Sequence, residues 1–228
     1  MAANEPSVAP GHAPVRWLRW ALWIVVALLA LIAAIVYLVS RPARTAAPTM
    51  PPASALPAQT WAAGKLRAPT FTLRDEHGAS LALAAFRGRP VVMAFIDPVC
   101  RDYCPTEAKH LNDVVAAFPA GEKPVVVAVS VNAFENAPSV LRLDRRKWSL
   151  GPQWHWAVGP GASLAKVWSA YHIAVLASTK TIAGVRVHRI AHTEAAYVID
   201  RNGFERALFL WPYKADGVVS VLRALRSP

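Results

Sequence analysis

The chain of 228 residues has two cysteines, and both lie in the stretch AFIDPVCRDYCPTEAKHL, residues 94–111. The run RPVVMAFID that leads into this stretch is continuously apolar, as is typical of a buried strand. Cys100 therefore follows the carboxyl end of a strand, which is where open α/β sheets carry their chemistry. Pro105 disfavours helical geometry for Cys104 and suits the first helical position, so we expect Cys104 to cap a helix.

Two thiols at the start of a helix allow three kinds of chemistry. The positive end of the helix, with Arg101 nearby, favours the thiolate and lowers the thiol pKa. The pair can form an inert disulfide, although so short a ring constrains the unfolded chain little. It can exchange disulfides with a client protein, although such motifs more usually place two residues between the cysteines. It can also bind a soft metal ion, Cu(I) or Zn(II), which usually requires a third ligand.

The seven histidines are the candidates for that third ligand. Five of them are less suited by position. His12 precedes the apolar N-terminal segment, His77 lies in a turn, and His110 points away from the helix start. The other two, His155 and His172, lie among apolar residues. His188 and His192 remain, in VHRIAHTEAAYVID. His192 directly precedes a buried strand at the mouth of the domain, which suits a ligand that arrives from a loop.

The order of the expected elements is that of an α/β domain. A hairpin is expected over 70–86 with its turn at His77-Gly78, strands over 89–97, 124–131, 195–200 and 206–211, and helices over 105–118, 139–148, 163–171 and 218–226. Asn202-Gly203 marks the turn between the last two strands. This order predicts a thioredoxin-like fold with a central sheet flanked by helices. The segment 173–189 is extra to a minimal version of that fold.

The N-terminal part is predicted to be a membrane anchor. Residues 20–39 carry no charge and would form a helix of roughly 30 Å, which matches the hydrocarbon core of a bilayer. The run is longer than the core of a signal peptide, about 7–15 residues, which favours an uncleaved anchor over a cleaved signal. We expect a short tail over 1–16, the anchor over 17–40, a Pro/Ala-rich linker over 41–67 and the folded domain over 68–228.

The formal net charge of +11 raises the question of nucleic-acid binding. The basic residues are scattered, apart from the cluster RLDRRKW over 142–148, and no zinc-finger, homeodomain or RNA-recognition pattern accompanies them. We therefore expect no nucleic-acid partner. The arginines flanking the anchor nearly balance, so the positive-inside rule leaves its orientation open.

Four segments resemble the Sco/SenC family of copper chaperones in order and spacing: TFTLRDEHG, FRGRPVVMAFIDPVCRDYCP, VVVAVSV and AHTEAAYVIDRNG. The resemblance covers most of residues 69–223. It implies a thioredoxin-like domain on the periplasmic side of the bacterial inner membrane, with the mitochondrial inner membrane as the alternative. It also implies copper as the cofactor, with Cys100, Cys104 and His192 as its ligands.

The same resemblance implies a role in building the CuA centre of cytochrome c oxidase. The implied partners are the copper-binding subunit of the oxidase or another copper chaperone. It leaves open whether Cys100 and Cys104 act as a redox-active pair in a membrane-tethered thiol–disulfide oxidoreductase. Two positions depart from the family pattern: Ala191 stands where the family commonly has Asp, and Asn132 replaces an acidic residue. Both departures remove negative charge near the expected site.

Overall fold

The computed structural model describes residues 15–39 and 52–226, and the chain divides into two units, Met1–Thr49 and Met50–Pro228. The first unit is described by the helix α1 (Val15–Val39). Within it, Arg19–Tyr37 has a mean hydropathy of 2.6 and is long and apolar enough to cross a membrane. A signal sequence near the N-terminus meets the same criterion, so the predicted anchor stays a prediction.

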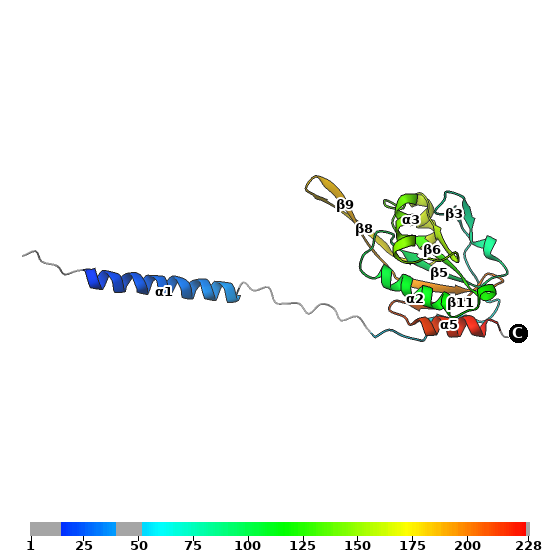
Figure 1. Cartoon of the computed structure of the whole chain (residues 1–228), viewed down its shortest axis with the longest axis horizontal. Helices are drawn as coiled ribbons and strands as arrows, with labels where there is room; N and C mark the ends of the chain where they lie inside the picture. The colour runs from blue at the N-terminus through cyan, green and yellow to red at the C-terminus, as the bar shows by residue number, and fades with distance from the viewer. Residues whose placement is uncertain (1–14, 40–51, 227–228) are drawn as a thin grey trace, which may run out of the picture. The chain divides into compact units, whose positions relative to one another are not determined.

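The second unit is a mixed α/β domain (Figure 1). Its strands are β1 (Gln59–Thr60), β2 (Leu66–Arg67), β3 (Thr72–Arg74), β4 (Ser80–Ala82), β5 (Val91–Ile96), β6 (Val125–Ser130), β7 (Trp154–Ala157), β8 (Val175–Ile182), β9 (Val185–His192), β10 (Ala195–Ile199) and β11 (Phe204–Leu210). Its helices are α2 (Cys104–Ala116), α3 (Pro138–Lys147), α4 (Gly161–Ala170) and α5 (Ala215–Ala224), with short 3-10 turns η1 (Leu83–Phe86) and η2 (Ala120–Glu122). The predicted α/β order is confirmed.

The central sheet has the strand order β1-β11-β10-β5-β6-β7, and β2 also pairs with β11. β5, β6 and β7 run parallel, whereas β10 pairs antiparallel with both β5 and β11. Every residue of β5 and β6 is buried, as their continuous apolar runs predict for strands covered on both faces. The carboxyl ends of these two strands carry the loops that hold the cysteines and Asn132.

Alternate residues of β5 supply two hydrophobic clusters, one on each face of the sheet. Val92, Ala94 and Ile96 pack with α2 and α5, while Val91, Met93 and Phe95 pack with α4. Figure 1 shows α2 and α5 on the same side of the sheet, where the two helices are in contact. The covered sheet therefore fixes the loop after β5 and the start of α2 on a rigid base.

The domain begins earlier than the predicted boundary at residue 68. β1 and β2 pair with β11, and a bridge joins Ser54 to Tyr213. Residues 54–67, which fall in the expected linker, therefore belong to the folded domain. The strand β7 was not predicted either, because four residues between Gly151 and Gly159 are too few to show a period.

The extra segment folds as the hairpin β8–β9, which projects from the domain in Figure 1. Its turn is made by Ala183 and Gly184, both with positive φ, 48° and 79°. Midway along the hairpin, where His188 pairs with Thr179, the ring of His188 stacks on Phe134 with centroids 4.0 Å apart. His192 is the last residue of β9, and the hairpin therefore controls where this imidazole lies.

Candidate metal centre

The loop between β5 and α2 brings the two cysteines together. The backbone N–H of Cys100 donates to the carbonyl of Asp97 at 3.1 Å, which turns the chain back after the strand. The backbone N–H of Cys104 then donates to Sγ of Cys100 at 3.5 Å. Cys104 is the first residue of α2 and Tyr103 is its cap, so the expectation that Cys104 caps the helix was wrong by one residue. Both cysteines are free thiols.

The pKa values of the two thiols are shifted in opposite directions. The pKa of Cys100 is lowered to about 6, chiefly because its sulfur accepts a hydrogen bond from the Cys104 thiol, and backbone N–H groups at the helix start add to this. Cys104 is 1% exposed, and the pKa of its thiol is raised by that same hydrogen bond, by burial and by the charge on Cys100. At neutral pH the pair therefore holds one proton between the two sulfurs.

Arg101 has a different role from the one expected. Its guanidinium donates to the carbonyls of Pro98 and Cys100 at 3.2 and 2.9 Å and contacts Asp144 at 3.5 Å. The arginine thus ties the loop to α3. The low pKa of Cys100 arises instead from the Cys104 thiol and the N–H groups of the helix start.

We expect the alkylation rate of the reduced protein by iodoacetamide to rise with pH through a midpoint near 6. A lowered thiol pKa means that the reactive thiolate is present above that pH and lost below it. Peptide mapping should place the early label on Cys100 and leave Cys104 unlabelled. Cys104→Ala removes the donating thiol, so its midpoint should move up toward the ordinary thiol range. A midpoint above 8 in the unchanged protein would contradict the asymmetry.

Two carboxyl groups near the thiols were not recognised as part of the site from the sequence. Glu107 is 1% exposed, and burial, followed by the charge of Glu194, raises its pKa to about 8. The hydroxyl of Tyr213 donates to its Oε1 at 3.0 Å. Burial and the Cys100 thiolate raise the pKa of Glu194 to about 7. A negative charge on either carboxyl is therefore poorly solvated here, and a cation at the thiols would stabilise the ionised forms.

The helical spacing of buried residues in α2 could have pointed to Glu107, because it shares the inward face with Cys104 and Leu111. Glu194 and Tyr213 carry no such local signal. They reach the site only through the pairing of β10 and β11 beside β5.

Asn132 has a clear structural role. Its side chain is fully buried, and its Nδ2 donates to Oδ1 of Asp97 at 2.9 Å, while its Oδ1 accepts from the backbone N–H groups of Phe134 and Glu135. An ionised carboxylate in its place has no proton to donate to Asp97. The amide therefore connects the loop after β6 to the loop that carries Cys100.

His192 has the properties of a metal ligand. Its Nδ1–H donates to the carbonyl of Thr193 at 3.0 Å, which leaves Nε2 as the lone-pair nitrogen. Burial lowers its pKa, so the imidazole is neutral at pH 7. Over residues 15–39 and 52–226, however, no three His, Cys, Asp or Glu side chains are gathered closely enough to hold a metal ion. The structure places Cys100 next to Cys104 but does not bring His192 into an assembled three-ligand site.

The other described histidines have structural surroundings or lie in solvent. His110 Nδ1 donates to the carbonyl of Tyr213 at 3.1 Å, and the ring of His155 packs against Phe86 at 4.9 Å between centroids. His77 lies in the expected turn. His172 is exposed, although its neighbours Tyr171 and Ile173 are buried.

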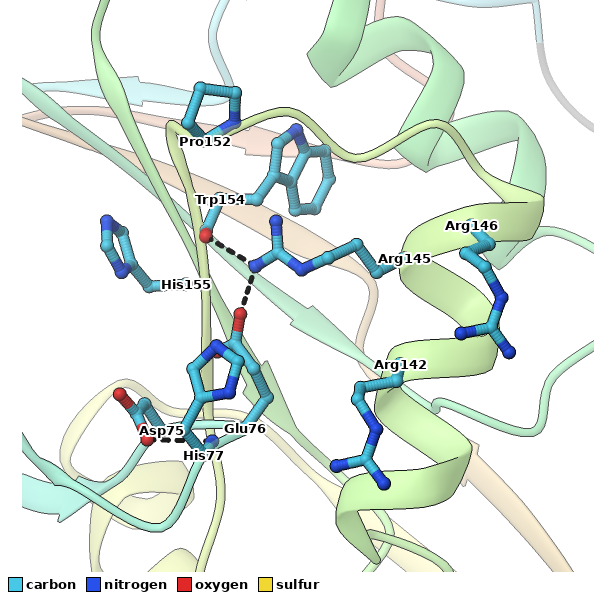
Figure 2. Close-up of a pocket in the computed structure, with 9 residues that line it drawn as sticks. All are labelled: Asp75, Glu76, His77, Arg142, Arg145, Arg146, Pro152, Trp154 and His155. Atoms are coloured by element: carbon cyan, nitrogen blue, oxygen red, sulfur yellow. Dashed lines mark hydrogen bonds and ion pairs between the residues drawn. The ribbon is translucent and has the colours of Figure 1, made fainter.

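A groove of about 500 Å³ lies apart from the thiols (Figure 2). It runs between the β3–β4 turn, α3 and the start of β7, and its lining residues are Asp75, Glu76, His77, Arg142, Arg145, Arg146, Pro152, Trp154 and His155. None of the expected ligands lines it. The groove and the candidate metal centre are therefore separate sites on the domain.

Comparison with known proteins supports the fold. ScoI of Bradyrhizobium japonicum, solved with copper bound, is 21% identical with a TM-score of 0.60, covering 70% of this chain and 99% of that one. Apo Sco1 of Thermus thermophilus is 23% identical with a TM-score of 0.58, covering 74% and 99%. Yeast Sco1 with copper bound is 16% identical with a TM-score of 0.62, covering 72% and 90%. These likenesses confirm the predicted thioredoxin-like fold.

No curated protein matches the chain. The SCO1/SenC family model, by contrast, matches residues 61–226, which is most of the chain. This range contains both cysteines, His192 and all of the central sheet except β1. The protein therefore belongs to the SCO1/SenC family.

Proposed function

We propose that the protein binds copper through Cys100, Cys104 and His192 and serves in the assembly of cytochrome c oxidase. The observation that carries the proposal is that the two free thiols lie side by side at the start of a helix, with one sulfur ionised at neutral pH. Family membership and the copper-bound structures of related Sco proteins support it.

The donor set suits Cu(I). Thiolate sulfur is the soft ligand that selects Cu(I), and an imidazole can complete a three-coordinate site of net charge −1. Cys104 is protonated in the metal-free protein, so binding must release its proton and metal affinity must rise with pH. Bound copper would also lower the raised pKa values of Glu107 and Glu194, so these carboxyls add to the proton release on binding.

His192 can join or leave the thiols without disturbing the central sheet. It ends the hairpin β8–β9, which pairs only within itself in the described residues. A ligand on such an element can approach Cys100 and Cys104 when copper binds and withdraw when copper passes to a partner. Oxidation of the two thiols to a disulfide would remove both sulfur ligands, so the redox state of the pair can gate delivery.

The proposed setting is a membrane surface outside the cytoplasm. The candidate span in α1 would anchor the chain in a bacterial inner membrane, with the domain in the periplasm. The proposed partners are the copper-binding subunit of the oxidase, at its CuA site, or another copper chaperone. A mitochondrial inner membrane is the alternative setting.

The test is a Cu(I) titration of residues 50–228, reduced and without oxygen, against a competing chelator. This fragment contains the whole central sheet and both hydrophobic clusters. We expect one tightly bound copper per chain and a loss of at least about tenfold in His192→Ala, the lower end of what loss of a supporting residue at a metal site costs. His77→Ala, which removes an exposed imidazole, is the matched control.

Equal affinity in the His192 and His77 variants would exclude His192 as a ligand. Weak copper binding by the unchanged fragment would exclude the copper function itself.

A second function, thiol–disulfide exchange, is favoured by the acidity difference between the thiols. The Cys100 thiolate can attack a client disulfide to form a mixed disulfide, and Cys104, after losing its proton, can displace the reduced client thiol. Two electrons pass to the client, and the protein is left with a Cys100–Cys104 disulfide. Reduction of a client that survives in His192→Ala would support this function over the copper function.

A further inference from the structure

The hairpin β8–β9 has two unlike faces. Residues that pair across the strands share a face, and successive pairs alternate between faces. One face carries Val175, Ile190 and His188, which pack toward the body of the domain. The other face carries Leu176 and, at the turn, the cross-strand pair Ile182 and Val185. These three side chains are 72%, 55% and 64% exposed.

An isolated two-stranded hairpin is marginally stable in water at best, and it needs a further strand or an apolar layer against it. β8 and β9 pair with no other described strand, and the side chains of Leu176, Ile182 and Val185 stay largely exposed. Covering Ile182 and Val185 would therefore stabilise the hairpin where it is farthest from the domain.

The charge of the hairpin is of one sign. Lys180, Arg186 and Arg189 lie between residues 175 and 192, and this stretch contains no Asp or Glu. Lys180 and Arg186 flank the turn, one on each face. Basic side chains at an exposed strand edge can serve to prevent edge-to-edge pairing. That role does not account for Ile182 and Val185, because a protected edge avoids exposed apolar side chains.

The size of the hairpin favours a lipid surface over a protein as its occupant. Two strands of eight residues present a face of about 10 Å by 26 Å, roughly 260 Å². A stable protein interface covers about 800 Å² on each partner. A membrane surface has no such minimum when a tether keeps the protein nearby, and the candidate span Arg19–Tyr37 would supply that tether.

We propose that the tip of the β8–β9 hairpin, Ile182–Val185 flanked by Lys180 and Arg186, inserts into the headgroup layer of an anionic membrane surface. The apolar pair enters the boundary between headgroups and acyl chains, and the two cations pair with lipid phosphates. The contact would fix the orientation of the domain above the bilayer.

The test is co-sedimentation of residues 50–228 with vesicles of phosphatidylcholine, with and without phosphatidylglycerol. This fragment lacks α1, which would otherwise hold the chain on any vesicle, and lipid in large excess compensates for the missing tether. We expect binding only to the anionic vesicles. Lys180→Gln/Arg186→Gln should weaken it about twenty- to thirtyfold, because each basic residue near such a surface contributes about 1 kcal/mol. Ile182→Ser/Val185→Ser should weaken it about tenfold or more, because both apolar side chains leave the lipid.

The matched control is Arg142→Gln/Arg146→Gln, which removes the same charge from α3. It should retain binding within about twofold of the unchanged fragment, since the proposed contact does not involve α3. Retained Cu(I) affinity and far-ultraviolet circular dichroism establish that each variant is folded.

An equal loss in the hairpin and α3 charge variants would overturn the proposal, because the attraction would then follow net charge alone. Binding that is unaffected by the Ile182/Val185 change would also overturn it. If neither hairpin variant affects vesicle binding, the occupant to seek is instead an acidic protein surface.

Discussion

Replacing either cysteine by serine is expected to abolish tight Cu(I) binding. A serine hydroxyl stays protonated at neutral pH and is a hard ligand, so Cys100→Ser and Cys104→Ser each remove one of two soft donors. Binding of a structural Zn²⁺ ion contributes about 10–16 kcal/mol. Divided over three or four ligands, this is roughly 2.5–5 kcal/mol for each ligand, so the loss of one should lower the affinity by about seventyfold or more. Competition titration under anaerobic conditions measures the loss.

The control for these variants is Thr106→Ala, an exposed residue in the same first turn of α2. It should bind copper like the unchanged protein, which separates ligand loss from disturbance of the helix start. Copper affinity that survives in both cysteine variants would rule out the thiol site. The variants also separate the two functions: with a disulfide client, Cys104→Ser should accumulate a mixed disulfide at Cys100, whereas Cys100→Ser should form none.

The sequence predicted those parts of the fold in which the local pattern and the tertiary environment agree. β5 and β6 are continuous apolar runs, and they are the strands buried on both faces. The turns at Gly78 and Gly203 were recognisable because glycine is the residue that adopts positive φ at little cost. Both glycines have positive φ in the structure, 86° and 77°. The short strands β1 and β2 gave no comparable signal. They form because β11 offers an edge, a property of the folded sheet that no local pattern records.

In the candidate site, too, the sequence predicted what the local pattern determines and missed what depends on tertiary packing. The spacing of Cys100 and Cys104 and the proline after them placed both thiols in one loop. The opposite shifts of their pKa values depend on which sulfur is buried, and this follows from the packing of α2. The contact between Glu107 and Tyr213 joins residues on α2 and after β11. His192 as a ligand rests on the family pattern and stays a prediction.

The ion pair between Glu76 and Arg145, two of the residues that line the groove in Figure 2, is expected to contribute strongly to the stability of the fold. Glu76 is 3% exposed and accepts hydrogen bonds from the guanidinium of Arg145 and, at 3.1 Å, from the backbone N–H of Trp156. Arg145 also donates to the carbonyls of Leu150, Gly151 and Trp154 at 3.2, 3.0 and 2.9 Å. One guanidinium thereby joins α3, the loop before β7 and the β3–β4 turn.

Arg145→Ala is expected to lower the free energy of unfolding by roughly 3–5 kcal/mol, because it leaves a buried carboxylate without its cation. Arg146→Ala removes an exposed neighbour with no ion pair among the described residues, and it should change stability by less than about 0.5 kcal/mol. Urea unfolding of residues 50–228 measures both.

The double variant Glu76→Gln/Arg145→Ala shows which part of the loss is electrostatic. If the unpaired charge dominates, removing it should restore part of the stability lost in Arg145→Ala, and the double-mutant cycle should show coupling of about 1 kcal/mol or more. A loss that persists in full would assign the effect to the three carbonyls instead. Equal stability of Arg145→Ala and Arg146→Ala would contradict both explanations. Copper affinity should be unchanged throughout, because no residue of this groove belongs to the thiol site.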